Sequence, residues 1–239
     1  MNDLKEHEAI SLSVVVPVYN EEGSIERLFK EILDMCRAGM DGVPFDYEII
    51  LVNDGSTDRT DAICRSLAPV RYICFPENRG QTAAMDCGFH LARGGLIAAL
   101  DGDGQNDPAE IPRMIRYLRE HDLDAVSGWR RKRKDTPGKR AASRLAYLAR
   151  QVLLRDGIHD SGCTLKVYRR ECFEGWRLKS DWHRFIPALL KQRGFRVGEM
   201  EVRHRERTAG RTKYNITRGI RGLRDMLAIR RLALRGKLR

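Results

Sequence analysis

The sequence predicts an α/β protein in which helices flank a mostly parallel β-sheet. Short apolar segments alternate along the chain with longer segments whose apolar residues recur every three or four positions. The apolar segments end at Pro, Asn or Asp, which favour turns. This alternation is typical of strand–helix–strand units, which build parallel sheets covered by helices. With 239 residues, 42% of them apolar, the chain is long enough for one domain with a core and an appendage.

The first half of the chain is predicted to contain four strands separated by helices. The strands are residues 12–16, 47–52, 70–75 and 96–100. The helices are residues 21–36, a segment that ends near residue 67, and residues 82–92. In the first helix, Ile25 and Leu28 share one face. Ser56 or Thr57 is expected to cap the second helix. Pro108 is expected to open a fourth helix, because its missing N–H costs nothing at that position.

The second half is less regular, but it continues the alternation. Further strands are predicted at residues 124–127, 164–168 and 195–202. Helices are predicted at residues 139–154, 181–192 and 216–234. Residues 205–214 are basic and contain Gly210, so we expect a flexible loop there. The chain is therefore divided into a main domain, residues 1–214, and a basic amphipathic helix and tail, residues 215–239.

The last predicted helix combines an apolar face with many basic residues. Its apolar face consists of Ile216, Ile220, Leu223 and Leu227. Basic amphipathic helices of this kind bind the interface of anionic membranes. The alternative is a helix that packs its apolar face against the domain, and both interpretations stay open. No segment approaches the roughly 18 apolar residues of a membrane span. The polar, acidic N-terminus is unlike a secretory signal, so we expect a cytosolic protein.

Composition limits the partners and the redox state. The net charge of +11 is concentrated in the second half, with ten Lys or Arg at residues 130–155 and thirteen at residues 203–239. Such charge favours an anionic partner, which is a small phosphate, a nucleic acid or an acidic membrane. The chain has no helix-turn-helix, zinc-finger or aromatic RNA-binding motif, which argues against nucleic acid. The six cysteines lack Cys-x-x-Cys spacing, so we expect reduced, mostly buried thiols and no zinc site.

Two carboxylates follow the fourth predicted strand directly. Asp101 and Asp103 flank Gly102 at the end of the apolar segment 96–100. Two anions this close repel each other unless a cation lies between them, so the pair indicates a site for a hard divalent cation. The turns at residues 17–21 and 53–58 also follow predicted strands. In open parallel sheets ligands bind beyond the carboxyl ends of the strands, so we expect one site where the three turns meet.

Four motifs occur in the order found in a known enzyme family. They are residues 16–21 (Val-Pro-Val-Tyr-Asn-Glu), 52–58 (Val-Asn-Asp-Gly-Ser-Thr-Asp), 78–80 (Asn-Arg-Gly) and 101–105 (Asp-Gly-Asp-Gly-Gln). Together they resemble inverting family 2 glycosyltransferases of the GT-A fold, and within these the polyprenyl-phosphate sugar transferases of the dolichol-phosphate mannose synthase type. Residues 207–214 are similar to that group's Arg-x-x-Gly-x-Ser-Lys loop, with Thr212 in place of Ser. The resemblance implies that residues 1–214 are a catalytic domain.

The resemblance assigns a donor site to residues of these motifs. It implies that Mg²⁺ or Mn²⁺ is held by Asp101 and Asp103 with help from Gln105, and that Asp54 hydrogen-bonds the base. Arg207 and Lys213 would close over the diphosphate as a cationic lid. The residues implied in nucleotide-sugar binding are Pro17, Tyr19, Glu21, Val52, Asp54, Gly102, Gln105, Arg207 and Lys213.

The resemblance also assigns an acceptor side, with Asp160 as a catalytic candidate near the reacting centre. The implied binders of the acceptor phosphate are Arg130, Arg140, Ser143 and Arg144. A phosphate acceptor is already an oxyanion at neutral pH, so positioning and cationic contacts should dominate over general-base catalysis. His183 stands where relatives carry Glu, and a structural role is expected for it.

The implied activity is transfer of a hexose from a UDP- or GDP-sugar to a polyprenyl phosphate, with inversion, at the cytoplasmic face of the membrane. The enzyme would reach the lipid as a peripheral protein on an anionic membrane surface, through its basic tail. The alternative is a soluble or glycan hydroxyl acceptor, which would need a true base and would make Asp160 essential. The base, the sugar, the prenyl chain and the oligomeric state stay open.

Overall fold

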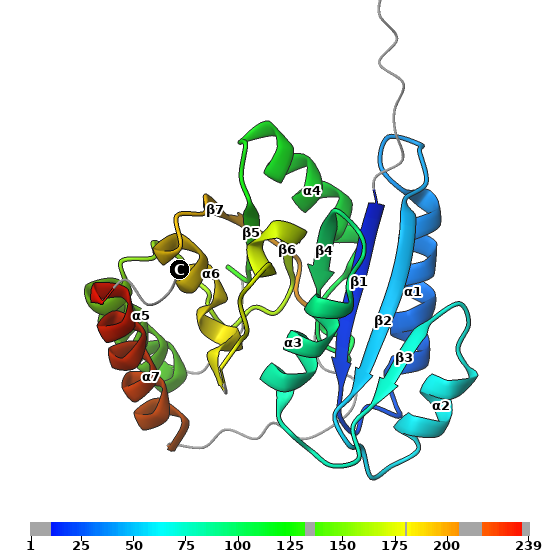
Figure 1. Cartoon of the computed structure of the whole chain (residues 1–239), viewed down its shortest axis with the longest axis horizontal. Helices are drawn as coiled ribbons and strands as arrows, with labels where there is room; N and C mark the ends of the chain where they lie inside the picture. The colour runs from blue at the N-terminus through cyan, green and yellow to red at the C-terminus, as the bar shows by residue number, and fades with distance from the viewer. Residues whose placement is uncertain (1–10, 132–136, 180, 206–216, 236–239) are drawn as a thin grey trace, which may run out of the picture.

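A seven-stranded β-sheet forms the centre of the molecule (Figure 1). The computed structural model describes residues 11–131, 137–179, 181–205 and 217–235. The strands are β1 Ser11–Val18, β2 Asp46–Asn53, β3 Arg71–Cys74, β4 Leu96–Ala99, β5 Ala125–Trp129, β6 Lys166–Arg169 and β7 Val197–Glu201. From one edge of the sheet to the other they lie in the order β3-β2-β1-β4-β6-β5-β7.

The sheet is mostly parallel, as the sequence predicts. The first four strands run in the same direction, and β7 runs parallel to β5. β6 is antiparallel to both of its neighbours, β4 and β5. Residues 12–18 of β1 are all buried, because helices cover both faces of the sheet. The central strands therefore carry continuous apolar runs rather than a strict alternation of apolar and polar residues.

Helices lie on both faces of the sheet. The α-helices are α1 Ile25–Ala38, α2 Thr60–Ser66, α3 Gln81–Leu91, α4 Ile111–Glu120, α5 Pro137–Leu154, α6 Ile186–Gln192 and α7 Thr217–Leu234. Successive side chains of β1 point to opposite faces. Val14 and Val16 belong to the core formed with α1 and α4, whereas Val15 belongs to the core formed with α3 and α6. The 3₁₀ turn Pro108–Glu110 precedes α4, in agreement with the predicted role of Pro108.

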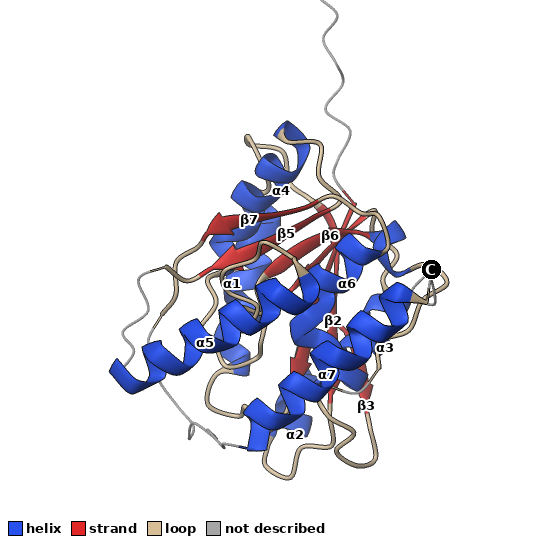
Figure 2. Ribbon diagram, turned by 90° about the vertical axis from the view of Figure 1, so that its left-hand side faces the viewer, coloured by secondary structure: helices blue, strands red, loops and turns tan. Residues whose placement is uncertain are grey.

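α5 and α7 lie side by side on the side of the sheet that α3 and α6 cover (Figures 1 and 2). Met226 and Ile229 of α7 are buried in a third core cluster with Leu154 and Leu189. The Arg230 guanidinium donates to the Leu153 carbonyl oxygen at 2.9 Å and links the two helices. Within the described residues, no helix combines the length and apolarity needed to cross a bilayer.

One predicted helix cap is wrong. α2 begins at Thr60, whose N–H donates to Asp58 Oδ1 at 2.9 Å. The Ser56 hydroxyl instead donates to Asn53 Oδ1 at 2.6 Å, and the Thr57 N–H donates to Asn20 Oδ1 at 2.8 Å. The Ser56 hydroxyl oxygen also accepts a hydrogen bond from the Asn20 N–H at 3.0 Å, so both residues connect turns rather than cap a helix. The predicted loop at 205–214 lies outside the described residues except for Arg205.

Candidate active site

The polar turns after β1 and β2 meet at one edge of the sheet. The strands pair in parallel register up to Val18 opposite Asn53, so both turns begin at the same level. The Asn20 N–H donates to the Ser56 hydroxyl oxygen at 3.0 Å, and the Asp54 N–H donates to the Val18 carbonyl oxygen at 2.9 Å. Hydrogen bonds from both directions therefore fix the two turns against each other, as expected from their places at the strand ends.

Asp54 is a buried carboxylate at this edge. Its side chain accepts a hydrogen bond from the Arg79 N–H at 2.7 Å, which connects it to the segment before α3. Burial raises the pKa of Asp54, while hydrogen bonds from the backbone of Arg79 and Gly80 act in the opposite direction. Asp54 is thus held in a fixed orientation beside the two turns, at the place where the sequence analysis expects a base to bind.

The other predicted nucleoside contacts differ in exposure. Pro17 is buried in β1, and Tyr19 is 37% exposed just beyond the strand. Glu21 is partly buried and accepts a hydrogen bond from the Ser24 hydroxyl at 3.0 Å. Val52 is fully buried in the core, where it is paired with Pro17 of β1 and Ile73 of β3.

The turn after β4 packs closely against the end of β1. A Cβ atom at Gly102 would lie 2.8 Å from Val18 Cγ1 and 3.3 Å from the Pro17 carbonyl oxygen, so a larger residue would push the turn away. The Ser24 hydroxyl donates to the Gly102 carbonyl oxygen at 2.8 Å. Gly102 therefore allows Asp101 and Asp103 to reach the same edge as Asp54.

Asp101 is placed where negative charge accumulates. Its Oδ1 atom accepts a hydrogen bond from Gln81 Nε2 at 2.5 Å. Desolvation, together with the charge of Asp103, raises the pKa of Asp101 to about 6, although Thr164, Lys166 and Arg130 lower it. Burial and the charge of Asp103 disfavour the ionised form of Asp101, and a cation beside it would stabilise that form. The two aspartates therefore fit a divalent metal ion.

The donor set for such a metal is small. The described residues contain no group of three or more His, Cys, Asp or Glu that could hold a metal. Asp101 and Asp103 would therefore need neutral oxygens, such as that of the Gln105 amide, and oxygens of the ligand. The Gln105 N–H donates to Asp103 Oδ1 at 3.0 Å, and its Nε2 atom donates to the Arg205 carbonyl oxygen at 3.4 Å.

Arg205 connects the segment after β7 to the turn after β4. Its N–H donates to the Gln105 carbonyl oxygen at 2.9 Å. Its guanidinium forms ion pairs with Glu31 at 2.6 Å and Asp107 at 2.8 Å. Arg205 is therefore an ordered anchor beside the predicted metal turn. Arg207 and Lys213, the predicted lid residues, lie outside the described residues.

Arg130 and Asp160, both predicted for the acceptor side, form a bidentate ion pair. Arg130 Nε donates to Asp160 Oδ2 at 2.7 Å, and Nη2 donates to Oδ1 at 2.9 Å. The side chains are only 12% and 17% exposed. Although burial opposes it, the hydrogen bonds and positive charge of Arg130 lower the pKa of Asp160. Asp160 is therefore an ionised carboxylate and a weak base.

The charge of Lys166 lowers the pKa of both Asp101 and Asp160. This residue is fully buried on β6, and its ammonium donates to the Cys163 carbonyl oxygen. Burial lowers the pKa of Lys166, whereas the negative charges of Asp160 and Asp101 act in the opposite direction. Its positive charge therefore acts on both the metal turn and the Arg130–Asp160 pair.

A family model described as glycosyl transferase family 2 matches residues 13–176. The chain belongs to glycosyl transferase family 2. It is 40% identical to "Dodecaprenyl-phosphate galacturonate synthase" of Rhizobium johnstonii, over 93% of this chain and 67% of that protein. It is 35% identical to "Undecaprenyl-phosphate 4-deoxy-4-formamido-L-arabinose transferase" of Aeromonas hydrophila, over 90% of this chain and 66% of that protein. The chain thus spans about two thirds of the length of these curated relatives.

Solved structures show the same fold for this glycosyltransferase. Mannosyl-3-phosphoglycerate synthase from Rubrobacter xylanophilus matches with a TM-score of 0.70 at 18% identity, over 95% of this chain and 75% of that one. Glucosyl-3-phosphoglycerate synthase from Mycobacterium tuberculosis, solved with Mn²⁺ and uridine-diphosphate-glucose, matches with a TM-score of 0.68 at 17% identity. This match covers 92% of the present chain and 77% of the Mycobacterium tuberculosis enzyme. The predicted α/β fold and the predicted family are confirmed, whereas the basic amphipathic character of the C-terminal helix stays a prediction.

On the acceptor side of the glycosyltransferase, some predicted residues cannot be placed. The side chains of Arg140 and Ser143 are outside the described part of α5, and Arg144 is exposed on the same helix. His183 is buried, and its Nδ1 atom forms a hydrogen bond with the Thr82 hydroxyl at 2.7 Å. This contact agrees with the structural role expected for His183.

The sequence analysis missed several residues that shape the site. They are Gln81, Thr164, Lys166 and Arg205. Gln81 follows the Asn-Arg-Gly motif directly, and this proximity was a usable signal. Lys166 begins the antiparallel strand β6, Thr164 precedes that strand and Arg205 follows β7, and no local pattern marks these three residues.

Proposed function

We propose that this chain transfers a glycosyl group from a nucleoside-diphosphate sugar to a polyprenyl phosphate, with inversion at the anomeric carbon. An oxygen of the acceptor phosphate forms a bond to C1, and the bond from C1 to the donor diphosphate breaks. The nucleoside diphosphate leaves with both electrons of that bond. The names of the two relatives support a polyprenyl-phosphate acceptor.

The Arg130–Asp160 pair is the observation that carries the proposal. A hydroxyl acceptor must lose a proton as it attacks, so it needs a base whose pKa is near the working pH. Asp160, the acid beside the acceptor side, has a lowered pKa and is paired to Arg130. A phosphate oxygen already carries negative charge and needs no proton removed. An acceptor side whose acid is a weak base therefore favours phosphate over a hydroxyl.

On the donor side, the residues fit a divalent cation. We expect Asp101, Asp103 and Gln105 to hold Mg²⁺ or Mn²⁺, which would offset the charge that develops on the departing diphosphate. A structural neighbour was solved with Mn²⁺ and a uridine-diphosphate sugar. We propose that Tyr19 and Asp54 orient the nucleoside and that Arg207 and Lys213 are cationic groups that cover the diphosphate.

The outer helices support peripheral binding to the membrane that contains the acceptor. Large apolar side chains are exposed on α5 and α7, with Leu148 51% and Val152 70% exposed. Leu223, Leu227 and Leu234 are exposed on α7. Arg144, Arg155, Arg224 and Arg231 are exposed on the same two helices or at their ends. Each basic residue near anionic headgroups contributes about 1 kcal/mol. We therefore propose that these helices face the cytoplasmic surface of the membrane.

A donor panel tests the proposed function. Purified protein is incubated with UDP- and GDP-sugars, with Mn²⁺ or Mg²⁺, and with or without polyprenyl phosphate in detergent. We expect a glycosylated polyprenyl phosphate from at least one donor, and none after chelation of the metal. Transfer to a soluble or glycan hydroxyl, with no lipid product from any donor, would overturn the proposal.

A further inference from the structure

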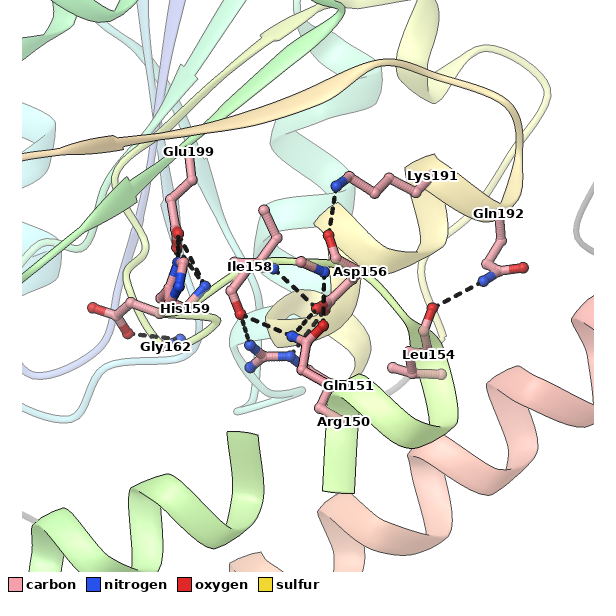
Figure 3. A network of polar contacts seen from close by, with 12 residues as sticks. Arg150, Gln151, Leu154, Asp156, Ile158, His159, Gly162, Lys191, Gln192 and Glu199 are labelled. Atoms are coloured by element: carbon pink, nitrogen blue, oxygen red, sulfur yellow. Dashed lines mark hydrogen bonds and ion pairs between the residues drawn. The ribbon is translucent and has the colours of Figure 1, made fainter. Parts of the chain in front are cut away.

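Glu199 holds the backbone of the loop that carries Asp160. It lies on the edge strand β7, and its side chain is only 9% exposed. Its Oε1 atom accepts hydrogen bonds from the N–H groups of His159 and Asp160, both at 2.9 Å. Its Oε2 atom lies 2.9 Å from the His159 N–H and 2.7 Å from His159 Nδ1 (Figure 3). The Glu199 carboxylate thus binds the peptide N–H groups of His159 and Asp160 and the imidazole ring of His159.

Asp160 is therefore held from two directions. Its peptide N–H is bound by Glu199, and its carboxylate is bound by the Arg130 guanidinium. Asp160 also accepts a hydrogen bond from the Arg130 N–H at 3.2 Å and from the Gly162 N–H at 3.2 Å. Since charged acceptors form the stronger hydrogen bonds in proteins, Glu199 is a firm anchor for this loop. A shift of the Asp160 peptide would turn the Arg130 guanidinium with it.

The start of the same loop is fixed as well, by α5 and α6. Arg150 forms a buried ion pair with Asp156 at 2.9 Å. The Gln151 side chain accepts a hydrogen bond from the Gly157 N–H at 2.9 Å, and Lys191 donates to the Asp156 carbonyl oxygen at 2.5 Å (Figure 3). The residues before Asp160 are thus constrained, and Glu199 supplies the constraint nearest to Asp160 itself.

The His159 ring, which Glu199 binds, also stacks on two aromatic residues. It stacks on Trp129 with ring centroids 4.5 Å apart and on Tyr147 of α5 with centroids 5.5 Å apart. Trp129 directly precedes Arg130 in the chain. Glu199, by binding His159 Nδ1, orients the ring that separates Trp129 from Tyr147. Glu199 thus binds His159, which stacks on Trp129, and these two residues directly precede Asp160 and Arg130 in the chain.

We propose that Glu199 is a positioning residue for the acceptor side of the reaction. It fixes the peptides of His159 and Asp160, and Asp160 in turn sets the orientation in which the Arg130 guanidinium meets the acceptor phosphate. This inference rests on the proposed function for its substrate, but its geometric part concerns the loop alone. A residue that served stability only would affect donor and acceptor kinetics equally.

Steady-state kinetics of Glu199 variants test the inference. We expect Glu199→Ala to lower kcat/KM for polyprenyl phosphate about 100-fold, the loss typical of a reacting group misplaced by about 1 Å. The KM of the donor and the Mn²⁺-dependent thermal protection by UDP or GDP should stay unchanged. Glu201→Ala is the matched control, because Glu201 lies two residues further on the same strand, is 43% exposed and pairs only loosely with Arg131 at 3.7 Å. Equal losses for donor and acceptor would overturn the proposal.

Glu199→Gln keeps the shape of the side chain and one acceptor oxygen. Because a neutral acceptor forms a weaker hydrogen bond than a carboxylate, we expect a smaller loss of about 5-fold, again confined to the acceptor. This variant also decides the question if Glu199→Ala does not fold. A loss that falls on the donor instead would contradict the positioning role.

A double-mutant cycle tests whether Glu199 acts through Asp160. In an Asp160→Asn background, we expect Glu199→Ala to change acceptor kcat/KM by no more than about 2-fold, because coupled residues are not additive. A full additional loss would show that Glu199 acts independently and would overturn the inference.

Hydrogen exchange separates this inference from the proposed function. In Glu199→Ala the amides of residues 157–162 should exchange faster than in the wild type, and in Glu201→Ala they should not. If the wild type shows no transfer to polyprenyl phosphate, the proposed function fails while the exchange measurement still decides the anchoring role. Unchanged exchange in Glu199→Ala would refute that role whatever the activity.

Discussion

Replacing Arg130 by Met should destabilise the protein through Asp160. The two side chains form paired hydrogen bonds at 2.7 and 2.9 Å and are 12% and 17% exposed. Removing one partner of such a pair leaves a buried charge without compensation, at a cost of about 3 kcal/mol when some water access remains. For a chain of this length, each kcal/mol lowers Tm by about 2–4 °C, so we expect a loss of about 6–12 °C.

Thermal and urea denaturation at pH 7.5 measure this loss. The double variant Arg130→Met, Asp160→Asn removes the charge as well, so it should recover much of the stability lost in the single variant. The folded-state pKa of Asp160 is lowered, so the stability it contributes is present above the unfolded value near 3.8 and is lost as the pH falls through the folded value. In the wild type this contribution should therefore stay constant between pH 6 and pH 8. A single variant that loses less than about 1 kcal/mol, or a double variant that recovers nothing, would refute the reasoning about a buried charge.

Three further predictions concern the metal turn and the outer helices. Asp103→Ala should abolish the Mn²⁺-dependent thermal protection by UDP or GDP, and protection that persists would contradict the metal assignment. Because the metal-free pKa of Asp101 is about 6, Mn²⁺ alone should bind about 10-fold more weakly at pH 5 than at pH 7.5, measured by the resonance of free Mn²⁺. The Asp101→Asn variant should lose this pH dependence. Leu148→Ser with Val152→Ser should weaken sedimentation with anionic vesicles several-fold, whereas serine at the buried Met226 should lower Tm instead.

The fold could be predicted because the strands and helices of the first half have clear periodicity. Each strand from β1 to β4 lies within a few residues of its predicted range, since apolar runs and turn residues mark both ends. The direction of β6 was not predictable in this way. Periodicity identifies a strand but does not say whether it runs parallel to its neighbours, and β6 pairs with β4 and β5 in the antiparallel sense.

The donor side was predictable from local sequence, and much of the acceptor side was not. Asp54, Asp101 and Asp103 all follow strands that end at one edge, so their proximity follows from the topology. Lys166 and Glu199 reach the site from β6 and β7, and their partners are far away in the sequence. Such long-range contacts depend on how the strands are ordered in the sheet, which no single segment specifies.

The cap at Ser56 or Thr57 was wrong for a related reason. The sequence places hydroxyl residues before a helix, where they commonly cap it. Here Asn20 and Asn53, from the turn after β1 and the end of β2, use these residues to join the turns. A tertiary contact thus replaces a local one, and it does so at the site.

Acceptor preference tests the central claim most directly. Wild-type protein, Mn²⁺ and the active donor are offered a polyprenyl phosphate or the polyprenol of the same chain length, and the lipid products are quantified. Our account predicts glycosylation of the phosphate at neutral pH and none of the alcohol, because Asp160 is held ionised by Arg130 and is a weak base. Comparable transfer to the alcohol would show that a true base is present and would contradict the account.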